Sequence, residues 1–204
     1  MQACSGASSE NVSMHFLHRL LRLPDSRLKR GIRACLFALF IGYGLPAAHL
    51  PVYAGGVLEY QVKAAFIYNF IAFTQWPDTS GPTINLCVYG EDFFGSEIDK
   101  LQNKSVDKRH INIARIGNPE KLTDCQVIFF SKSVSGSLSS LLINLPNRPI
   151  LTLADGPNAI SHGIMINMSL VNEKIIFEIN LGIVRQSGLD ISSKLLQLAT
   201  KVHQ

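Results

Sequence analysis

Long apolar runs, tryptophan, cysteine and charge are all scarce in this sequence of 204 residues, which has one tryptophan, four cysteines and 17% charged residues. The apolar run over residues 34–45 is 12 residues long, whereas a membrane-spanning helix needs about 20. The G-x-G-x-x-G pattern, the P-loop and the G-x-S-x-G elbow are absent. These absences argue against a chain of many membrane spans, the common nucleotide-binding enzymes and the α/β-hydrolases.

Excess positive charge is confined to the first quarter of the chain. Residues 1–54 hold six basic and two acidic residues, a net charge of +4, which is the net charge of the whole sequence. The other 150 residues hold 13 basic and 13 acidic side chains. Because no basic excess is left there, the sequence does not favour binding to nucleic acid.

The order of features over residues 1–54 is typical of a secretory signal peptide. A basic stretch at residues 27–33 precedes the apolar run, and a glycine and a proline that weaken a helix follow it. Val52-Tyr53-Ala54 then places small residues three and one positions before Gly55, which is a cleavage pattern.

We therefore predict a leader over residues 1–54, cleaved near Ala54, and one exported domain over residues 55–204. An uncleaved membrane anchor is the alternative, since the apolar run can be extended beyond its proline. Translation starts at Met1 or at Met14, which the sequence leaves open.

The predicted leader contains two of the four cysteines, Cys4 and Cys35, and the exported domain keeps Cys87 and Cys125. An exported domain with two cysteines favours one disulfide. Closing this loop stabilises a fold by about 4 kcal/mol in the loop-entropy model. Two separate buried thiols are the alternative. A metal site is not expected, because no pair of histidines accompanies the cysteines.

Two segments resemble catalytic motifs but have structural explanations. Residues 90–95 lie where a doubly wound fold binds phosphate, yet two acidic residues there would repel it. Ser131-Lys132-Ser133 offers a nucleophile and a base for a hydrolase, but it also suits a helix cap and a solvated face. The three histidines of the exported part, none at metal-ligand spacing with another, are His110, His162 and His203.

Periodicity and turn residues predict alternating helices and strands. The first helix, over residues 58–75, has a wide apolar stripe that we expect to be buried. The stripe contains Val62, Ala65, Phe66, Asn69, Phe70 and Phe73, with Ile67 and Ile71 beside it. Further helices are predicted over residues 92–103, 133–145 and 191–202, and strands over residues 84–89, 110–116, 125–131, 149–155, 164–170 and 174–180.

This alternation predicts an α/β fold, a three-layer α/β/α sandwich with a mixed, mainly parallel sheet and a C-terminal β-hairpin plus helix. Strand order 2-1-3 would place the strands of Cys87 and Cys125 side by side. A ligand would then bind at the carboxyl edge of the sheet, near Gly90, Ser131 and Asp155.

Three sequence blocks make the exported part resemble the YfiR-like family of exported bacterial proteins. The first runs from Val62 to Phe70 and on to Phe73 and Trp76-Pro77. The second is the strand around Cys87 with Phe94-Gly95, followed by Cys125 and Ile128-Phe129. The third covers residues 163–167, 177–180 and 188–196. Together the blocks extend over residues 59–198.

The resemblance implies a periplasmic repressor that is not an enzyme and needs no cofactor. The best-known member binds the periplasmic region of an inner-membrane diguanylate cyclase, lowers cyclic di-GMP, responds to redox through disulfides and can be sequestered by an outer-membrane partner. Cys87 and Cys125 look like the family's pair, as a structural bridge or a redox switch. The exported part has no second pair, which argues against a switch built on two bridges. A homodimer is left open.

Four residues are candidates for a ligand or partner surface: Trp76, Asp155, Asn167 and Glu178. Trp76 is a binding anchor or a core residue, and Asp155 is a ligand contact or a turn cap. Glu178 alternates with apolar residues on its strand, and Asn167 lies in the family's third block. The main functional alternative to the repressor is a periplasmic small-ligand sensor that signals to a membrane protein.

Overall fold

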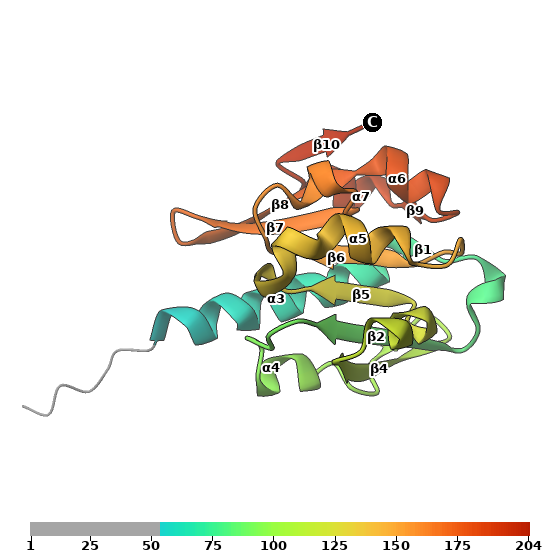
Figure 1. The fold of residues 1–204 in the computed structure, drawn as a ribbon, viewed down its shortest axis with the longest axis horizontal. Coiled ribbons are helices and arrows are strands. Elements are labelled where there is room, and N and C mark those ends of the chain that lie inside the picture. Colours follow the sequence, from blue (N-terminus) through green and yellow to red (C-terminus); the bar gives the residue numbers. More distant parts are fainter. Residues whose placement is uncertain (1–53) are drawn as a thin grey trace, which may run out of the picture. The chain divides into compact units, whose positions relative to one another are not determined.

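A mixed sheet of eight strands lies at the centre of residues 54–204, the part of the chain that this computed structural model describes (Figure 1). The predicted leader falls outside these residues except for Ala54. The strands are β2 (Thr83–Tyr89), β3 (Ser105–Val106), β4 (Arg109–Ile116), β5 (Val127–Phe130), β6 (Leu151–Ala154), β7 (Ile166–Val171), β8 (Lys174–Asn180) and β10 (Lys201–His203). Their order is β10-β8-β7-β6-β5-β2-β4-β3.

Most neighbouring strands in this sheet are parallel. The run β7-β6-β5-β2-β4 is parallel throughout, β8 is antiparallel to β7, and β3 is antiparallel to β4. β2 lies between β4 and β5, which is the predicted 2-1-3 order. The predicted hairpin is formed by β7 and β8, and its turn residues Asn172 and Glu173 have φ of 48° and 61°. Two such residues are typical of a type I′ hairpin turn.

Two apolar cores lie on opposite faces of the sheet. Adjacent residues of one strand, such as Leu86 and Cys87 or Ile128 and Phe129, belong to different cores. The predicted three-layer α/β/α sandwich is therefore confirmed. The first core is covered by α3 (Ala54–Ala72), α4 (Ser96–Asp99), α6 (Leu181–Gln186) and α7 (Ser193–Leu196), and the second by η2 (Pro119–Asp124), α5 (Leu138–Ile143) and η4 (Ala159–His162).

The buried face of α3 differs from the predicted one. Of the six residues in the predicted stripe only Phe70 is fully buried: Ala65 and Asn69 are exposed, and Val62, Phe66 and Phe73 are partly buried. The buried face contains Phe70, the neighbouring Ile67 and Ile71, and also Tyr60, Lys63 and Ala64. It is thus displaced toward Lys63, which has an acidic partner inside the fold.

Two predicted helices are shorter than expected because side chains hydrogen-bond locally. In the segment 92–103 only α4 is α-helical, and Asp92 Oδ1 accepts a hydrogen bond from the Phe94 backbone at 2.8 Å. The segment 133–145 divides into η3 (Lys132–Ser137) and α5. Ser135 and Ser137 donate hydrogen bonds to carbonyls three residues earlier, which competes with helix formation.

The predicted closing helix over residues 191–202 is wrong. The structure has the short helix α7 and then β10, which pairs in parallel with β8. The end of the chain forms a strand because the outer edge of β8 offers free backbone groups for pairing. Just before β10, the Thr200 backbone donates a hydrogen bond to the Phe177 carbonyl of β8 at 2.9 Å. Sequence periodicity also missed α6 and a small second sheet of β1 (Thr74–Gln75) and β9 (Asp190–Ile191).

Candidate functional site

Asp155, at the carboxyl end of β6, is the centre of a buried polar cluster. One carboxylate oxygen accepts hydrogen bonds from the Tyr60 hydroxyl and from Lys63 Nζ, each at 2.7 Å. The other accepts from the Lys132 backbone at 2.7 Å. Lys63 Nζ also lies 2.5 Å from Glu59 Oε1. We call Glu59, Tyr60, Lys63 and Asp155 the Lys63–Asp155 cluster.

The cluster is removed from solvent. The side chains of Lys63 and Asp155 are 2% and 0% exposed. Burial and the hydrogen bond to Asp155 raise the pKa of Tyr60 well above its ordinary value, so its hydroxyl remains a donor. Buried ion pairs bring little net stability, but removing one partner leaves an uncompensated charge. The cluster therefore fixes α3 against the end of β6.

The segment Ser131-Lys132-Ser133 lies at the same edge of the sheet. Its contacts are those of a helix cap and not of a catalytic serine–lysine pair. Ser131 is 1% exposed and its hydroxyl accepts from the Ser133 backbone at 3.4 Å, as a helix cap does. Ser133 Oγ accepts from the Glu91 backbone at 2.8 Å. Lys132 Nζ lies over the Phe93 ring, 4.7 Å from its centroid. These contacts support the capping interpretation of the segment.

The loop after β2, over residues 90–95, is fixed by ion pairs with Arg115 and is not a phosphate-binding loop of the kind considered from the sequence. Arg115 pairs with Asp92 at 2.6 Å and with Asp99 at 2.7 Å. Hydrogen bonds to Asp99 and Asp92 raise the pKa of Arg115 further above its ordinary value. Gly90 has φ of +98°, and an added Cβ would lie 2.7 Å from Ser133 Oγ. The loop is thus packed onto the residues after β5.

The other three candidate residues lie apart from the cluster or at its margin. Asn167 is 8% exposed, donates to the Gly156 carbonyl at 3.1 Å and has no partner for its own oxygen among the described residues. Glu178 faces it across the β7–β8 pair and bonds to His203 at 2.8 Å. Trp76 donates to the Ile71 carbonyl at 3.0 Å. Asn167 and Glu178 are therefore neighbours across the hairpin, and Asn167 bonds to the residue that follows Asp155.

Sequence reasoning missed Glu59, Tyr60 and Lys63 as members of the site. One signal was present, because Glu59 and Lys63 are four residues apart and such a pair meets on a helix face. Their burial has no local signal, since it depends on Asp155, which lies 92 residues from Lys63 in the chain.

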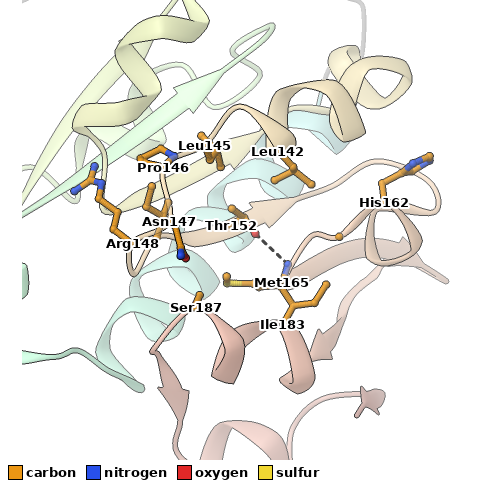
Figure 2. Close-up of a pocket in the computed structure, with 12 residues that line it drawn as sticks. Leu142, Leu145, Pro146, Asn147, Arg148, Thr152, His162, Met165, Ile183 and Ser187 are labelled. Atoms are coloured by element: carbon orange, nitrogen blue, oxygen red, sulfur yellow. Dashed lines mark hydrogen bonds between the residues drawn. The ribbon is translucent and has the colours of Figure 1, made fainter.

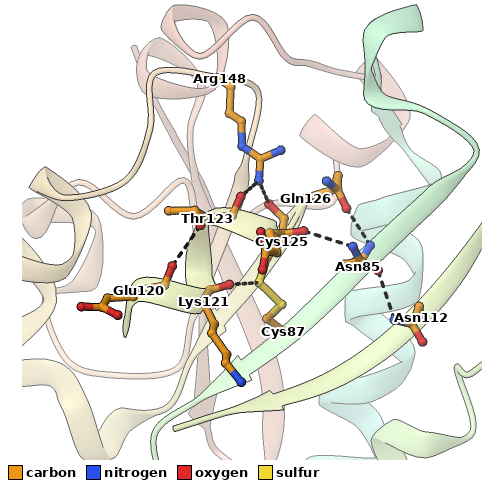
Figure 3. Close-up of a disulfide and its surroundings, with 10 residues drawn as sticks. Asn85, Cys87, Asn112, Glu120, Lys121, Thr123, Cys125, Gln126 and Arg148 are labelled. Atoms are coloured by element: carbon orange, nitrogen blue, oxygen red, sulfur yellow. Dashed lines mark hydrogen bonds between the residues drawn. A yellow bond between two sulfur atoms is a disulfide. The ribbon is translucent and has the colours of Figure 1, made fainter. Parts of the chain in front are cut away.

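Cys87 and Cys125 are joined in a disulfide between β2 and the segment entering β5 (Figure 3). Their Cα atoms are 6.0 Å apart, and both side chains are buried. Arg148 donates to the carbonyls of Cys125, at 3.0 Å, and of Thr123. Asn85 donates to the Asp124 carbonyl at 3.0 Å. The bridge therefore lies within a network that fixes the start of β5.

A cavity of about 340 Å³ lies near the amino end of β6, and Figure 2 shows the residues that line it. The Lys63–Asp155 cluster lies at the other end of this strand. Apolar and polar side chains both line the cavity. Thr152 Oγ1 in its wall accepts a hydrogen bond from the Met165 backbone at 3.1 Å. The sequence predicted a pocket at the carboxyl edge instead. The wall includes Leu142, Leu145, Asn147, Arg148, His162, Ile183 and Ser187.

Two apolar grooves flank the first half of α3. The larger, about 820 Å³, lies between α3 and the β7–β8 hairpin, whose Leu170 and Val171 are 50% and 43% exposed. The smaller, about 440 Å³, runs along α3 itself. Leu58, 61% exposed, lines both. Exposed apolar surface of this kind is typical of binding surfaces.

Within residues 54–204, no three histidine, cysteine, aspartate or glutamate side chains gather as metal ligands. In the same part of the chain, no helix is long and apolar enough to cross a bilayer. The geometry thus defines a class: a disulfide-bonded α/β domain whose polar edge is packed internally and whose surface has apolar grooves and a cavity of mixed polarity.

The family follows from the sequence profile. The profile of the YfiR/HmsC-like family matches residues 60–200. This chain belongs to that family, as the resemblance in its three sequence blocks predicted.

Two solved structures match this chain weakly. One is a "conserved domain protein from vibrio cholerae o1 biovar eltor str. n16961", with 8% identity and a TM-score of 0.46. The other is the "ABC domain in complex with L-Trp from Streptococcus pneumonia", with 9% identity and a TM-score of 0.45. Each match covers 70% of this chain and 60% of the other. Their similarity is too low to extend either protein's role or ligand to this chain.

Proposed function

We propose that this protein is an exported, non-catalytic regulator that binds the periplasmic region of an inner-membrane diguanylate cyclase and holds that enzyme inactive. The observation that carries the proposal is the family match over residues 60–200. A cyclase held in this way makes less cyclic di-GMP. An outer-membrane protein that sequesters the regulator would release the cyclase.

The packing of the carboxyl edge supports a binding role rather than catalysis. In many α/β folds this edge carries the reactive groups. Here Asp155 and Ser131 are buried, and their polar atoms bond to neighbouring protein groups. Accessible apolar grooves lie beside α3 and the hairpin. Such apolar surfaces suit association with another protein.

Export is supported by the leader pattern over residues 1–54 and by the disulfide, which persists in an oxidising compartment. We expect protein purified from the periplasm to begin near Gly55 and to show no free thiol when it is unfolded without reductant. The measurements are N-terminal sequencing and thiol counting. Two free thiols per chain would contradict the bridge.

Deleting the gene tests the regulatory role. We expect cyclic di-GMP and biofilm to rise, and the full chain to restore both when it is supplied again. The matched control is a chain without residues 1–54, which remains in the cytoplasm and should not restore them. Unchanged cyclic di-GMP in the deletion strain would contradict the proposal.

The cavity at the amino end of β6 favours a second candidate, a sensor of a small ligand. Its mixture of apolar walls and polar groups is common in ligand sites. A thermal-shift screen of nucleotides and amino acids tests it. A stabilising compound should lose its effect in a Thr152→Val variant, and a screen without a hit would remove this candidate.

A further inference from the structure

The cavity near the amino end of β6 is lined by apolar side chains and by basic groups without acidic ones. Six of its twelve lining residues have apolar side chains. Among the described residues that line it, Arg148 and His162 are basic, and none is an aspartate or a glutamate. The larger groove beside α3 differs, because Glu59 and Glu173 line it together with Lys174. The cavity therefore favours a ligand that is mainly apolar and carries a negative charge.

Arg148 is a partly buried cation that has no carboxylate partner within residues 54–204. Its Nη2 group donates to the carbonyls of Thr123 and Cys125 (Figure 3). Its Nε and Nη1 groups form no hydrogen bond to the described residues. Arg115, by contrast, pairs with two aspartates. A guanidinium presents five N–H donors in a fork that matches a carboxylate, so Arg148 has donors left for an anion.

The guanidinium of Arg148 is fixed before a ligand arrives. Since two backbone carbonyls already hold it, binding an anion costs less side-chain entropy than at a mobile surface arginine. Figure 2 shows Arg148 at one end of the row of lining residues and His162 at the other, with Leu142, Met165 and Ile183 between them. This order suits a ligand with its charge at one end and an apolar body behind it.

Thr152 adds a buried donor near the middle of the same wall (Figure 2). The residue is 3% exposed, and its hydroxyl accepts a hydrogen bond from the Met165 backbone at 3.1 Å. Within residues 54–204 this hydroxyl donates no hydrogen bond in return. A buried donor without an acceptor costs free energy. A ligand oxygen within reach would supply the acceptor.

We propose that this cavity binds a small apolar monocarboxylate, with the carboxylate on Arg148 and the hydrocarbon part against the apolar wall. Its volume of about 340 Å³ is near the lower end for small-molecule sites, roughly 300–1,000 Å³. An amino acid fits less well, because no acidic residue among the described lining residues would meet its ammonium group. The inference rests on the second function proposed above, the small-ligand sensor, and names the class of ligand.

Calorimetric titration of the processed, exported protein with hexanoate, hexanamide and hexylamine tests the ligand class. The three compounds share a carbon chain and differ in the head group. We expect hexanoate to bind, hexanamide to bind at least about tenfold more weakly, and hexylamine to show no binding, since hydrogen bonds to charged groups are the stronger ones. Phenylacetate is a second carboxylate of different shape. Equal affinity for hexanoate and hexanamide, or no binding of either carboxylate, would overturn the proposal.

A single added charge tests the location. Asn147 is exposed and lines the cavity, so Asn147→Asp places a carboxylate there without changing the size of the side chain. We expect the affinity for hexanoate to fall about tenfold, because the two negative charges repel. Asn144→Asp is the matched control, since Asn144 is also exposed but does not line the cavity. Unchanged affinity in Asn147→Asp would mean that hexanoate binds elsewhere and would overturn the site.

Removing the cation should have the larger effect. Arg148→Met should weaken hexanoate binding by about 10–100-fold, the range for a lost hydrogen bond to a charged group. Arg148 also fixes two carbonyls, so thermal unfolding is used to confirm that the variant is folded. If only amino acids or nucleotides bind, and Thr152→Val abolishes their binding, the ligand class is wrong and the sensor candidate stands. No binding by any compound removes both, and neither result depends on the cyclase.

Discussion

Lys63 and Ala65 lie two residues apart on α3 and have opposite surroundings. Lys63 is buried between two carboxylates, while Ala65 lies in an exposed apolar groove. A surface helix usually turns its apolar side to the core and its charges to water. On α3 a charged residue, Lys63, is buried and several apolar residues face solvent. A distant carboxylate can thus decide which side of a helix is buried, and apolar residues left outside become available for binding.

The largest effect is expected from removing the buried cation. Lys63→Met keeps the length of the side chain but leaves Asp155 without its charge partner, and we expect it to lower the free energy of unfolding by about 3–5 kcal/mol. Urea unfolding measures the change. Gln61→Met is the matched control on the exposed face and should change stability by less than about 0.5 kcal/mol. Equal effects of the two variants would contradict the comparison.

A smaller loss is expected for Tyr60→Phe. The variant removes a hydrogen bond to a charged group, which contributes about 1.5–3 kcal/mol. Tyr68→Phe is the control, because that hydroxyl bonds to the Ser105 carbonyl in an exposed position. Its loss should be at most about 1 kcal/mol.

Because of Tyr60, we expect the free energy of unfolding to decrease at alkaline pH. The pKa of Tyr60 is raised in the folded state, so its contribution is fully present below the unfolded-state pKa of about 10. Above that pH the unfolded chain loses the proton and the folded chain keeps it, which favours unfolding. Urea midpoints between pH 8 and pH 11 should fall less steeply for Tyr60→Phe than for the parent. Parallel curves would contradict the buried donor.

The smallest change in stability is expected on the exposed face of α3. Ala65→Glu adds an exposed carboxylate and should change the free energy of unfolding by less than about 0.5 kcal/mol. A loss above about 2 kcal/mol would mean that this face is packed within its own chain.

Local sequence patterns correctly predicted those elements that are surrounded by apolar residues on all sides. β5 was predicted from its continuous apolar run, and all four of its residues are buried. The Cys87–Cys125 pair was predicted from export and from the number of cysteines that remain. These features do not depend on which distant residue lies beside them.

The features that the sequence did not reveal depend on distant partners. The displacement of the buried face of α3 depends on Asp155, 92 residues from Lys63. β10 depends on the free edge of β8, which periodicity over residues 191–202 cannot indicate. Asp155 was selected as a candidate because ligand sites gather at strand ends, but the structure pairs its buried side chain with Lys63. Its partners on α3 were missed because they lie in an apolar helix.

The most direct test is the activity of the purified, full-length membrane cyclase during titration with the processed protein. We predict that synthesis of cyclic di-GMP falls to a low plateau as the periplasmic region becomes saturated. Unchanged synthesis at every concentration of folded, disulfide-bonded protein would contradict the proposed repression.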